Sequence, residues 1–299
     1  MDKKEISLII PHYNSSKKLE RLLKSVDNNI STKTQIIIVD DNSALHEIKK
    51  VKAMIVRMPR LNITLVGNNS GFNGAGAVRN IGLDLAVGDW ILFADSDDYF
   101  IQGSGLIISQ FLKRDDIDIV YFNVTSLNSV TKRKSKRHMV YSELITKYIN
   151  SNNITTENGL RYNYDVPWGK LIRRRLIIDN SIKFPQIMTS EDVEFSIKIG
   201  NLGRKITACK SVIYCVTEDE GNSVSKVNEN KKFFTAVDVS VRKNLYLNGQ
   251  LPYHEFKKIE SYSILFWTKY FLINKIKFIH YPKLIYKTIE YKKQLRGKK

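Results

Sequence analysis

The sequence predicts an α/β fold, with a mostly parallel central sheet flanked by helices and a basic, α-helical C-terminal extension. Short apolar runs of strand length alternate with segments of helical apolar spacing through the first half of the 299-residue chain. This alternation is typical of layered sheets whose neighbouring strands run mostly parallel. The end of the chain instead interleaves lysines with aromatic residues. We therefore place a main domain at residues 1–225 and a helical extension at residues 226–299.

The first strand is expected at residues 6–10, where an apolar run ends at Pro11. Asn14 or Ser15 then caps a helix, because apolar residues recur at helical spacing after them. Further strands are expected at residues 35–39, 62–66, 90–94, 118–124 and 213–216. Further helices are expected at residues 45–56 and 77–87, around Leu106, Ile107 and Phe111, and at residues 193–199.

The composition, with 42% hydrophobic residues, is that of an ordinary globular protein. No apolar run is long enough to span a membrane, and the N-terminus lacks the pattern of a secretory signal, so a cytoplasmic location is expected. Cys209 and Cys215 are the only cysteines. On one strand they would lie roughly 20 Å apart, so we expect two free thiols. No cysteine and histidine cluster has the spacing of a zinc site.

The formal charge of +18 is concentrated at the end of the chain. Residues 251–299 hold 12 Lys or Arg against 3 Glu, a net charge of +9. Basic and aromatic residues mixed in this way suit helices that lie on an anionic membrane surface, here the cytoplasmic membrane face. The alternative is that the apolar residues pack on the domain and the lysines are merely solvated. A second basic run, residues 132–138, is interpreted as a solvated loop.

The segment WILFADSDDYF ends an expected strand with Asp95, Asp97 and Asp98. Carboxylates held together repel one another unless a cation neutralises them. Hard oxygen ligands favour Mg²⁺ or Mn²⁺, which often bridge to the phosphates of a nucleotide. The alternative is a helix N-terminus, where one capping aspartate is common. Three aspartates after a buried strand favour the metal interpretation.

Parts of the sequence also fit two other classes of function. A Rossmann-type NAD-dependent oxidoreductase is suggested by Gly74, Gly76 and an acid about twenty residues on. However, the third glycine position holds Arg79, and the glycine turn follows the third expected strand. A noncatalytic nucleic-acid-binding protein is suggested by the pI of about 9.7. No RNA- or DNA-reading motif accompanies the charge, so nucleic acid is not expected as a partner.

Four segments carry a family resemblance: SLIIPHYN, IIIVDDNS, NSGFNGAGAVRNIGL and GDWILFADSDDYF. In this order and spacing they resemble the nucleotide-sugar-binding half of family 2 glycosyltransferases, which have the GT-A fold. VPWGKLIRR and TSEDVEFSIKIG extend the resemblance to about residue 225. It does not reach the C-terminal extension.

The resemblance implies a nucleotide site at the first two strands. Pro11, Tyr13 and Asn14 match positions that line the base pocket, and the Tyr13 ring is available to stack on a uracil. Asp40 matches a position that contacts the base, where a carboxylate can accept from a ring N–H. Arg79 matches the Arg of the family's ARN motif near the nucleotide. The alternative for Arg79 is a structural ion pair with one of the aspartates.

The resemblance also implies the metal site and the base. Asp95 and Asp97 match the DxD positions, with Asp95 facing the ribose and Asp97 ligating the metal, while Asp98 supports them from behind. Glu191 and Asp192 match the ED motif, in which the second acid takes the proton of the acceptor hydroxyl. Their alternative role is to open a helix, where acids are favourable.

Trp168 and Lys170 are expected in the acceptor or sugar pocket. Trp168 offers an apolar wall for a sugar ring, although a tryptophan is more often a core residue. The sequence also departs from the family pattern. The loop after the last strand, TEDEGNSVSK, lacks the family's His or Arg, and Ser223, Ser225 and Lys226 are the nearest replacements. The GFNGAG segment is more glycine-rich than the usual family turn.

The resemblance and the grouped acids together predict an inverting glycosyltransferase that depends on Mn²⁺ or Mg²⁺. The expected donor is a nucleotide-sugar, with a uridine diphosphate sugar favoured. The expected acceptor is a hydroxyl of a glycan or of a lipid-linked saccharide, as in bacterial surface polysaccharide or capsule biosynthesis.

Overall fold

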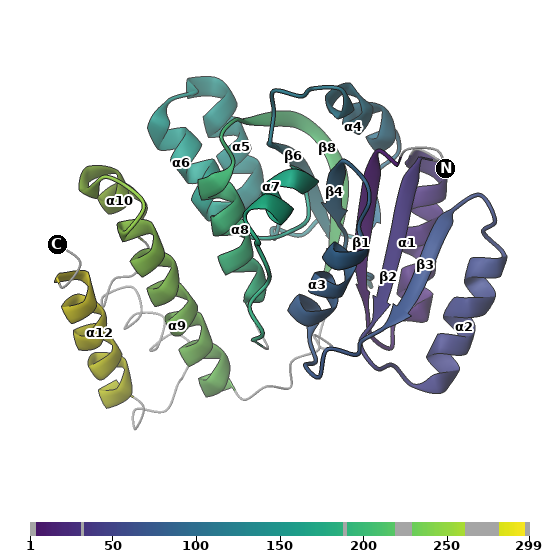
Figure 1. The fold of residues 1–299 in the computed structure, drawn as a ribbon, viewed down its shortest axis with the longest axis horizontal. Coiled ribbons are helices and arrows are strands. Elements are labelled where there is room, and N and C mark those ends of the chain that lie inside the picture. Colours follow the sequence, from purple (N-terminus) through teal and green to yellow (C-terminus); the bar gives the residue numbers. More distant parts are fainter. Residues whose placement is uncertain (1–3, 31–32, 188–189, 219–228, 261–280, 297–299) are drawn as a thin grey trace. The chain divides into compact units, whose positions relative to one another are not determined.

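The computed structural model describes residues 4–30, 33–187, 190–218, 229–260 and 281–296 (Figure 1). The chain divides into two compact units, Met1–Gly221 and Asn222–Lys299. The sequence analysis placed the boundary between residues 225 and 226.

The described part of the first unit contains a sheet with the strand order β3-β2-β1-β4-β7-β6-β8-β5. The strands are β1 (Ile6–His12), β2 (Thr34–Asp40), β3 (Asn62–Gly67), β4 (Trp90–Phe93), β5 (Tyr99–Phe100), β6 (Ile119–Asn128), β7 (Lys170–Arg173) and β8 (Ile206–Glu218). Strands β3, β2, β1 and β4 pair in parallel, as do β6 and β8, whereas β7 and β5 are antiparallel to their neighbours. The predicted α/β class with a mostly parallel sheet is confirmed.

Helices connect these strands and flank the sheet (Figure 1). They are α1 (Ser16–Asn29), α2 (Leu45–Val56), α3 (Ala75–Leu85), α4 (Ser104–Leu112), α5 (Met139–Ser151), α6 (Ile154–Asn163), α7 (Arg174–Asp179) and α8 (Glu191–Leu202). The sequence analysis did not predict α5, α6, α7, β5 or β7. It also placed only the end of β8, at residues 213–216, although this strand begins at Ile206.

The N-terminus of α1 is capped by a neighbouring helix. Ser15 stands at the N-cap position, as one of the two predicted caps, but its side chain makes no capping hydrogen bond. Instead, the Ser16 backbone N–H donates to Glu47 Oε2 of α2 at 3.0 Å. Hydrogen bonds from Lys50 and Ser16 lower the pKa of Glu47 to about 2, so this carboxylate is charged at neutral pH and complements the positive helix end.

An aromatic cluster joins β4 to α8. The rings of Phe184 and Phe195 stack with centroids 3.9 Å apart, and Phe93 of β4 meets both edge-on at 5.4 and 5.6 Å. All three side chains are buried. The three rings connect β4, Phe184 and α8. The cluster therefore fixes the position of the residues after β4 relative to the N-terminus of α8.

Gly105 permits a close contact between α4 and the end of α1. A Cβ at this position would lie 1.8 Å from the backbone oxygen of Asn29, and the Asn29 side chain also accepts from the Gly103 N–H at 2.9 Å. We expect Gly105→Ala to lower the free energy of unfolding by about 1–3 kcal/mol, because backbone must move to admit the methyl group. Urea denaturation measures this. Ser109→Ala, at an exposed position of the same helix, is the control, and an equal midpoint for both variants would contradict the expectation.

The second unit is helical where it is described. Its helices are α9 (Glu229–Asn248), α10 (Tyr253–Ile259) and α12 (Tyr281–Arg296). Phe233, Phe234 and Val237 of α9 pack with Leu284 and Tyr291 of α12. Some of the apolar side chains of the extension are therefore buried in a small core of its own. The apolar and basic residues at positions 261–280 lie outside the described residues.

One face of α12 keeps apolar side chains in solvent. Ile285, Tyr286 and Ile289 are exposed, and so are Lys292 and Lys293 of the next turn. None of the helices in the described ranges combines the length and apolar character needed to cross a bilayer.

Candidate active site

The parallel strands β1, β2 and β4 bring three polar stretches to one edge of the sheet. His12 at the end of β1 is in register with Asp40 at the end of β2. Residues 95–98 follow β4, which pairs with β1 on its other side. Because the carboxyl ends of parallel strands share an edge, Tyr13 and Asn14 lie at the same edge as these acids.

Two of the predicted nucleotide-binding residues differ in their surroundings. The Tyr13 side chain is 49% exposed, so its ring is open to a ligand. Asn14 has a left-handed backbone, with φ of 44°. Its Oδ1 accepts from the Ala44 N–H at 2.8 Å, and its own N–H donates to Ser43 Oγ at 2.8 Å. Asn14 therefore ties the end of β1 to the loop after β2. Pro11 lies inside β1.

Asp40 is engaged within the protein. Its Oδ1 lies 2.8 Å from His12 Nδ1, and its Oδ2 accepts from the Ser43 N–H at 2.9 Å. The side chain is buried. Both oxygens thus have protein partners, and the expected contact with a nucleotide base stays a prediction that depends on their remaining lone pairs.

Asp41, for which no role was predicted from the sequence, holds the glycine-rich loop. Its Oδ1 accepts from Asn68 Nδ2 at 2.6 Å, and its Oδ2 accepts from the Gly74 N–H at 2.7 Å. Gly74 has φ of 112°, a backbone conformation that L side chains rarely adopt. The glycine is required for this turn, and α3 begins at the next residue.

The three aspartates after β4 do not all face the same way. Asp98 is buried, accepts from the Thr217 N–H of β8 at 2.7 Å, and is also bonded to the Tyr214 hydroxyl. The same hydroxyl accepts from the Asp95 N–H at 2.9 Å. Burial, reinforced by Asp97 and Asp95, raises the pKa of Asp98. Asp98 therefore fixes the loop from behind, whereas Asp95 and Asp97 are partly exposed.

Arg79 of α3 joins the two acidic motifs. Its Nη2 donates to Asp95 Oδ1 at 2.7 Å, and its Nη1 donates to Glu191 Oε1 at 2.9 Å. The guanidinium is buried and lies over the Phe184 ring, 5.4 Å from its centroid. Burial acts to lower the pKa of Arg79, but the carboxylates of Asp95 and Glu191 outweigh it and raise the pKa. The structural ion pair that was the alternative for Arg79 is therefore present, and its expected place near the nucleotide stays a prediction.

A glycine lets α3 approach α8 closely enough for this bridge. A Cβ on Gly76 would lie 2.8 Å from Glu191 Cγ and 3.1 Å from the Pro185 oxygen. Glu191 is the first residue of α8, after Ser190 with a left-handed φ of 62°. The acids do open a helix, as the alternative interpretation expected. Glu191, however, also spans to Arg79, a residue 112 positions earlier in the chain.

Asp192 has the electrostatic surroundings of a base. Its side chain is half-buried in the first turn of α8. Burial raises the pKa of Asp192 to about 7, with Glu191 acting in the same direction and Arg79 opposing. A carboxylate with such a pKa is both available and basic enough to take a proton near neutral pH.

These motifs match a known family. A model of glycosyl transferase family 2 matches residues 7–179. The chain belongs to glycosyl transferase family 2. The match covers the strands that carry the nucleotide-site residues and the DxD positions, and the family resemblance stated from the sequence is confirmed.

Curated relatives of this glycosyltransferase are named for poly(ribitol-phosphate) or for cholesterol. It is 28% identical over 225 residues to the poly(ribitol-phosphate) beta-N-acetylglucosaminyltransferase TarS of Staphylococcus aureus. This match covers 74% of the chain but 37% of TarS, so the chain spans little more than a third of that relative's length. A cholesterol galactosyltransferase of Borreliella burgdorferi is 26% identical over 282 residues, covering 89% of this chain and 77% of the relative.

Solved structures show the same fold. Residues 1–349 of S. aureus TarS in complex with UDP-GlcNAc match with a TM-score of 0.71 at 23% identity, covering 97% of this chain and 81% of that one. The mannosyltransferase PcManGT of Pyrobaculum calidifontis, in complex with GDP-Man and Mn²⁺, matches with a TM-score of 0.54 at 16% identity, covering 81% and 63%.

Two residues predicted for the acceptor pocket lie in the core of the glycosyltransferase. Trp168 is 1% exposed and stacks on Tyr214, the residue that holds the aspartate loop. Lys170 is 0% exposed, and its Nζ donates to the Tyr164 backbone oxygen at 2.6 Å. Burial lowers the pKa of Lys170 to about 7. Because neither side chain reaches solvent, we assign both to support of the site and not to acceptor contact.

The described residues include no group of three or more histidines, cysteines or acids placed to hold a metal ion. The carboxylates after β4 are still chemically suited to a divalent ion. Mg²⁺ and Mn²⁺ usually take one or two protein carboxylates and complete their coordination shell with waters and substrate phosphates. Asp97 is the predicted protein ligand. The replacements considered for the family's loop residue, at positions 223, 225 and 226, lie outside the described residues.

Proposed function

We propose that the chain transfers a sugar from a uridine diphosphate sugar to a hydroxyl of a glycan or lipid-linked acceptor, with inversion at the anomeric carbon and with Mn²⁺ or Mg²⁺. The family supports the reaction class. The donor class is supported by TarS, whose structure holds UDP-GlcNAc. The acceptor class is supported by relatives named for poly(ribitol-phosphate) and cholesterol.

The observation that carries the proposal is the double ion pair of Arg79. Asp95 and Glu191 belong to motifs far apart in the sequence, yet both contact one buried guanidinium. The pair brings the expected donor-binding loop next to Asp192. Catalysis by proximity requires such an arrangement, because the acceptor hydroxyl must meet the anomeric carbon in line with the departing diphosphate.

On the donor side, each residue has a physical role. The exposed Tyr13 ring stacks on the base, and the partly exposed Asp95 carboxylate accepts from a ribose hydroxyl. Asp97 would hold the divalent ion. When bound, that ion offsets the charge on the diphosphate as the sugar bond breaks.

On the acceptor side, Asp192 takes the proton. The acceptor oxygen forms a bond to the anomeric carbon as its O–H proton passes to the Asp192 carboxylate. The bond between that carbon and the diphosphate oxygen breaks, and the diphosphate leaves with the electron pair. Attack from the opposite face inverts the anomeric configuration.

A panel of nucleotide-sugars tests the proposal. We expect a UDP-sugar with Mn²⁺ to raise the thermal unfolding temperature and to be slowly hydrolysed. In Asp97→Ala, the part of this shift that depends on Mn²⁺ should disappear, because the ion loses its protein carboxylate. Asp179→Ala, an exposed acid at the end of α7, is the matched control. Equal Mn²⁺ dependence in both variants would remove Asp97 from the metal site.

We also propose contact of the C-terminal extension with an anionic membrane surface. The exposed Ile285, Tyr286 and Ile289 lie on the same helix as the exposed Lys292 and Lys293. Aromatic and aliphatic side chains with nearby lysines are the composition that binds headgroup regions.

Liposome flotation measures this contact. Lys292→Glu with Lys293→Glu should reduce recovery on vesicles containing phosphatidylserine at least about tenfold, since each basic residue near such a surface contributes about 1 kcal/mol. The matched control is Lys49→Glu with Lys52→Glu, two exposed lysines of α2. If the two double variants were recovered with the vesicles in equal amounts, the α12 lysines would be solvated residues that do not contact the membrane.

A further inference from the structure

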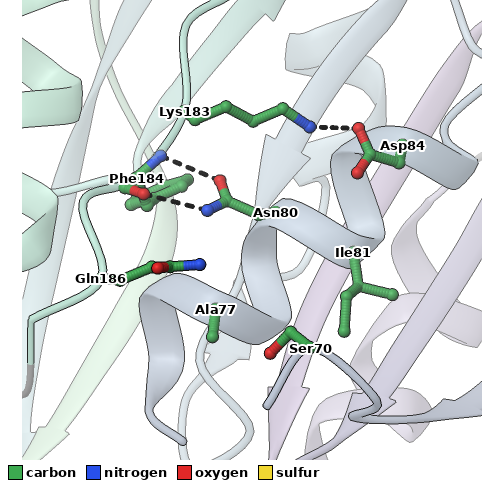
Figure 2. Close-up of a pocket in the computed structure, with 8 residues that line it drawn as sticks. All are labelled: Ser70, Ala77, Asn80, Ile81, Asp84, Lys183, Phe184 and Gln186. Carbon is green, nitrogen blue, oxygen red and sulfur yellow. Dashed lines mark hydrogen bonds and ion pairs between the residues drawn. The ribbon is translucent and has the colours of Figure 1, made fainter. Parts of the chain in front are cut away.

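A cavity of about 400 Å³ lies beside α3 (Figure 2). One wall is the α3 stripe of Ala77, Asn80, Ile81 and Asp84, and the other is formed within residues 183–186. Residues spaced three and four apart share one face of a helix, so the stripe runs along α3 for roughly 10 Å. The cavity lies along this stripe, and we call it the α3 groove.

The two walls of the α3 groove are fixed to each other. Asn80 Nδ2 donates to the Phe184 oxygen at 2.9 Å, and the Phe184 N–H donates to Asn80 Oδ1 at 2.9 Å. Lys183 forms an ion pair with Asp84 at the end farthest along α3 (Figure 2). Phe184 itself is anchored in the aromatic cluster with Phe93 and Phe195. The groove is thus built on rigid elements and does not depend on binding to form.

One end of the α3 groove lies next to the catalytic acids. Gly76, the residue before Ala77, is in contact range of Glu191 and of the Pro185 oxygen. Residues 183–186 form one wall of the groove and lead along the chain toward Glu191 and Asp192. A molecule that extends from the groove past Ala77 and Gly76 therefore approaches Glu191, the residue next to Asp192.

The lining suits a neutral, hydroxyl-rich ligand. Ile81, which is partly exposed, supplies apolar surface on which the C–H face of a sugar ring packs, whereas Ala77 of the lining is buried. The Gln186 amide reaches toward α3 between Asn80 and Ala77 (Figure 2). The Gln186 side chain is exposed and makes no hydrogen bond to the residues that the structure describes. Lys183 is neutralised by Asp84, which leaves the lining without the unpaired cations that a phosphate group needs.

We infer that the α3 groove binds an unreacted neutral sugar or polyol unit of the acceptor while a neighbouring unit is glycosylated. The inference rests on the proposed function and adds an acceptor subsite to it. The groove then contributes to acceptor choice, because a chain that fills it gains contacts that a single free sugar lacks.

Saturation-transfer NMR on the full chain tests the subsite, with methyl β-glucoside, cellobiose and ribitol as neutral probes. Binding of inorganic phosphate is measured separately by its ³¹P line width. At about 10 mM, a range suited to weak ligands, we expect transfer to at least one neutral probe. Gln186→Ala should reduce it at least about threefold through loss of the amide contacts. Ala77→Leu, which fills the groove, should abolish it. Gln110→Ala, an exposed glutamine on α4, is the matched control.

The outcomes separate the subsite from the proposed function. UDP-GlcNAc should raise the unfolding temperature of all variants alike, and absence of this shift in every protein, including the wild type, would count against the proposed donor. Three outcomes would overturn the subsite while the donor shifts stay normal. They are no saturation transfer to any neutral probe, equal transfer in Gln186→Ala and Gln110→Ala, and broadening of the phosphate signal alone. Because Gln186 is exposed, Gln186→Ala should fold normally. It therefore still tests the subsite if Ala77→Leu does not fold.

Discussion

Asp192→Asn should lower kcat about 10²–10⁴-fold while UDP-sugar binding stays unchanged. Asparagine has nearly the same shape but cannot accept the proton of the acceptor hydroxyl. Single-turnover kinetics give the rate, and calorimetric titration of the donor with Mn²⁺ gives the affinity. Glu194→Gln, an acid of the same helix that pairs with Lys198, is the control. A variant that keeps more than about a tenth of wild-type kcat would displace Asp192 as the base.

The pH dependence of the same reaction has a definite sign. The base must be deprotonated to act, and the pKa of Asp192 is raised to about 7. The rate should therefore rise with pH through about 7 and level off above it. Glu191 contributes to raising this pKa. In Glu191→Gln, we expect the rising limb to move to lower pH.

The strands that carry the site could be predicted because they contain continuous apolar runs. Strands β1, β2 and β4 are mostly buried parallel strands bounded by turn residues, a pattern that is local in sequence. Strand β7 lacks such a pattern. It begins with Lys170, whose burial depends on the Tyr164 oxygen and on the rings of Tyr121 and Tyr164. A lysine with such partners cannot be distinguished by sequence from a solvated one.

The candidate site was predicted as a set of residue types but not as a set of contacts. The acids and Arg79 were found from their motifs. An ion pair of Arg79 with an aspartate was the stated alternative for this residue. Its pair with Glu191 was not predicted, because the two residues are 112 positions apart and Glu191 had a local alternative as a helix-opening acid. Asp98 and Tyr214 also meet only when β8 lies behind the loop that follows β4. Asp41 carried a signal, since it follows a strand beside Asp40, but an acid that binds backbone looks the same in sequence as one that binds a ligand.

Arg79→Met should lower the free energy of unfolding by about 3–5 kcal/mol, the cost of leaving a buried charge without its partner. The unpaired group is chiefly Glu191, whose side chain is 12% exposed, against 29% for Asp95. Adding Glu191→Gln removes that charge, so the double variant should recover part of the loss. Urea denaturation of the four proteins gives the coupling energy. Arg175→Met is the control, because its side chain is 61% exposed and such surface pairs contribute about 0–1 kcal/mol.

Kinetics of two Arg79 variants separate its charge from its geometry. Arg79 opposes the rise in the pKa of Asp192, so Arg79→Met should move the rising limb of the pH profile to higher pH. Arg79→Lys keeps the charge and should leave the limb near 7. Lysine, however, lacks the planar fork that reaches Asp95 and Glu191 together, so its kcat should fall although its profile does not move. An unshifted limb in Arg79→Met, or full activity in Arg79→Lys, would show that the base does not depend on this bridge.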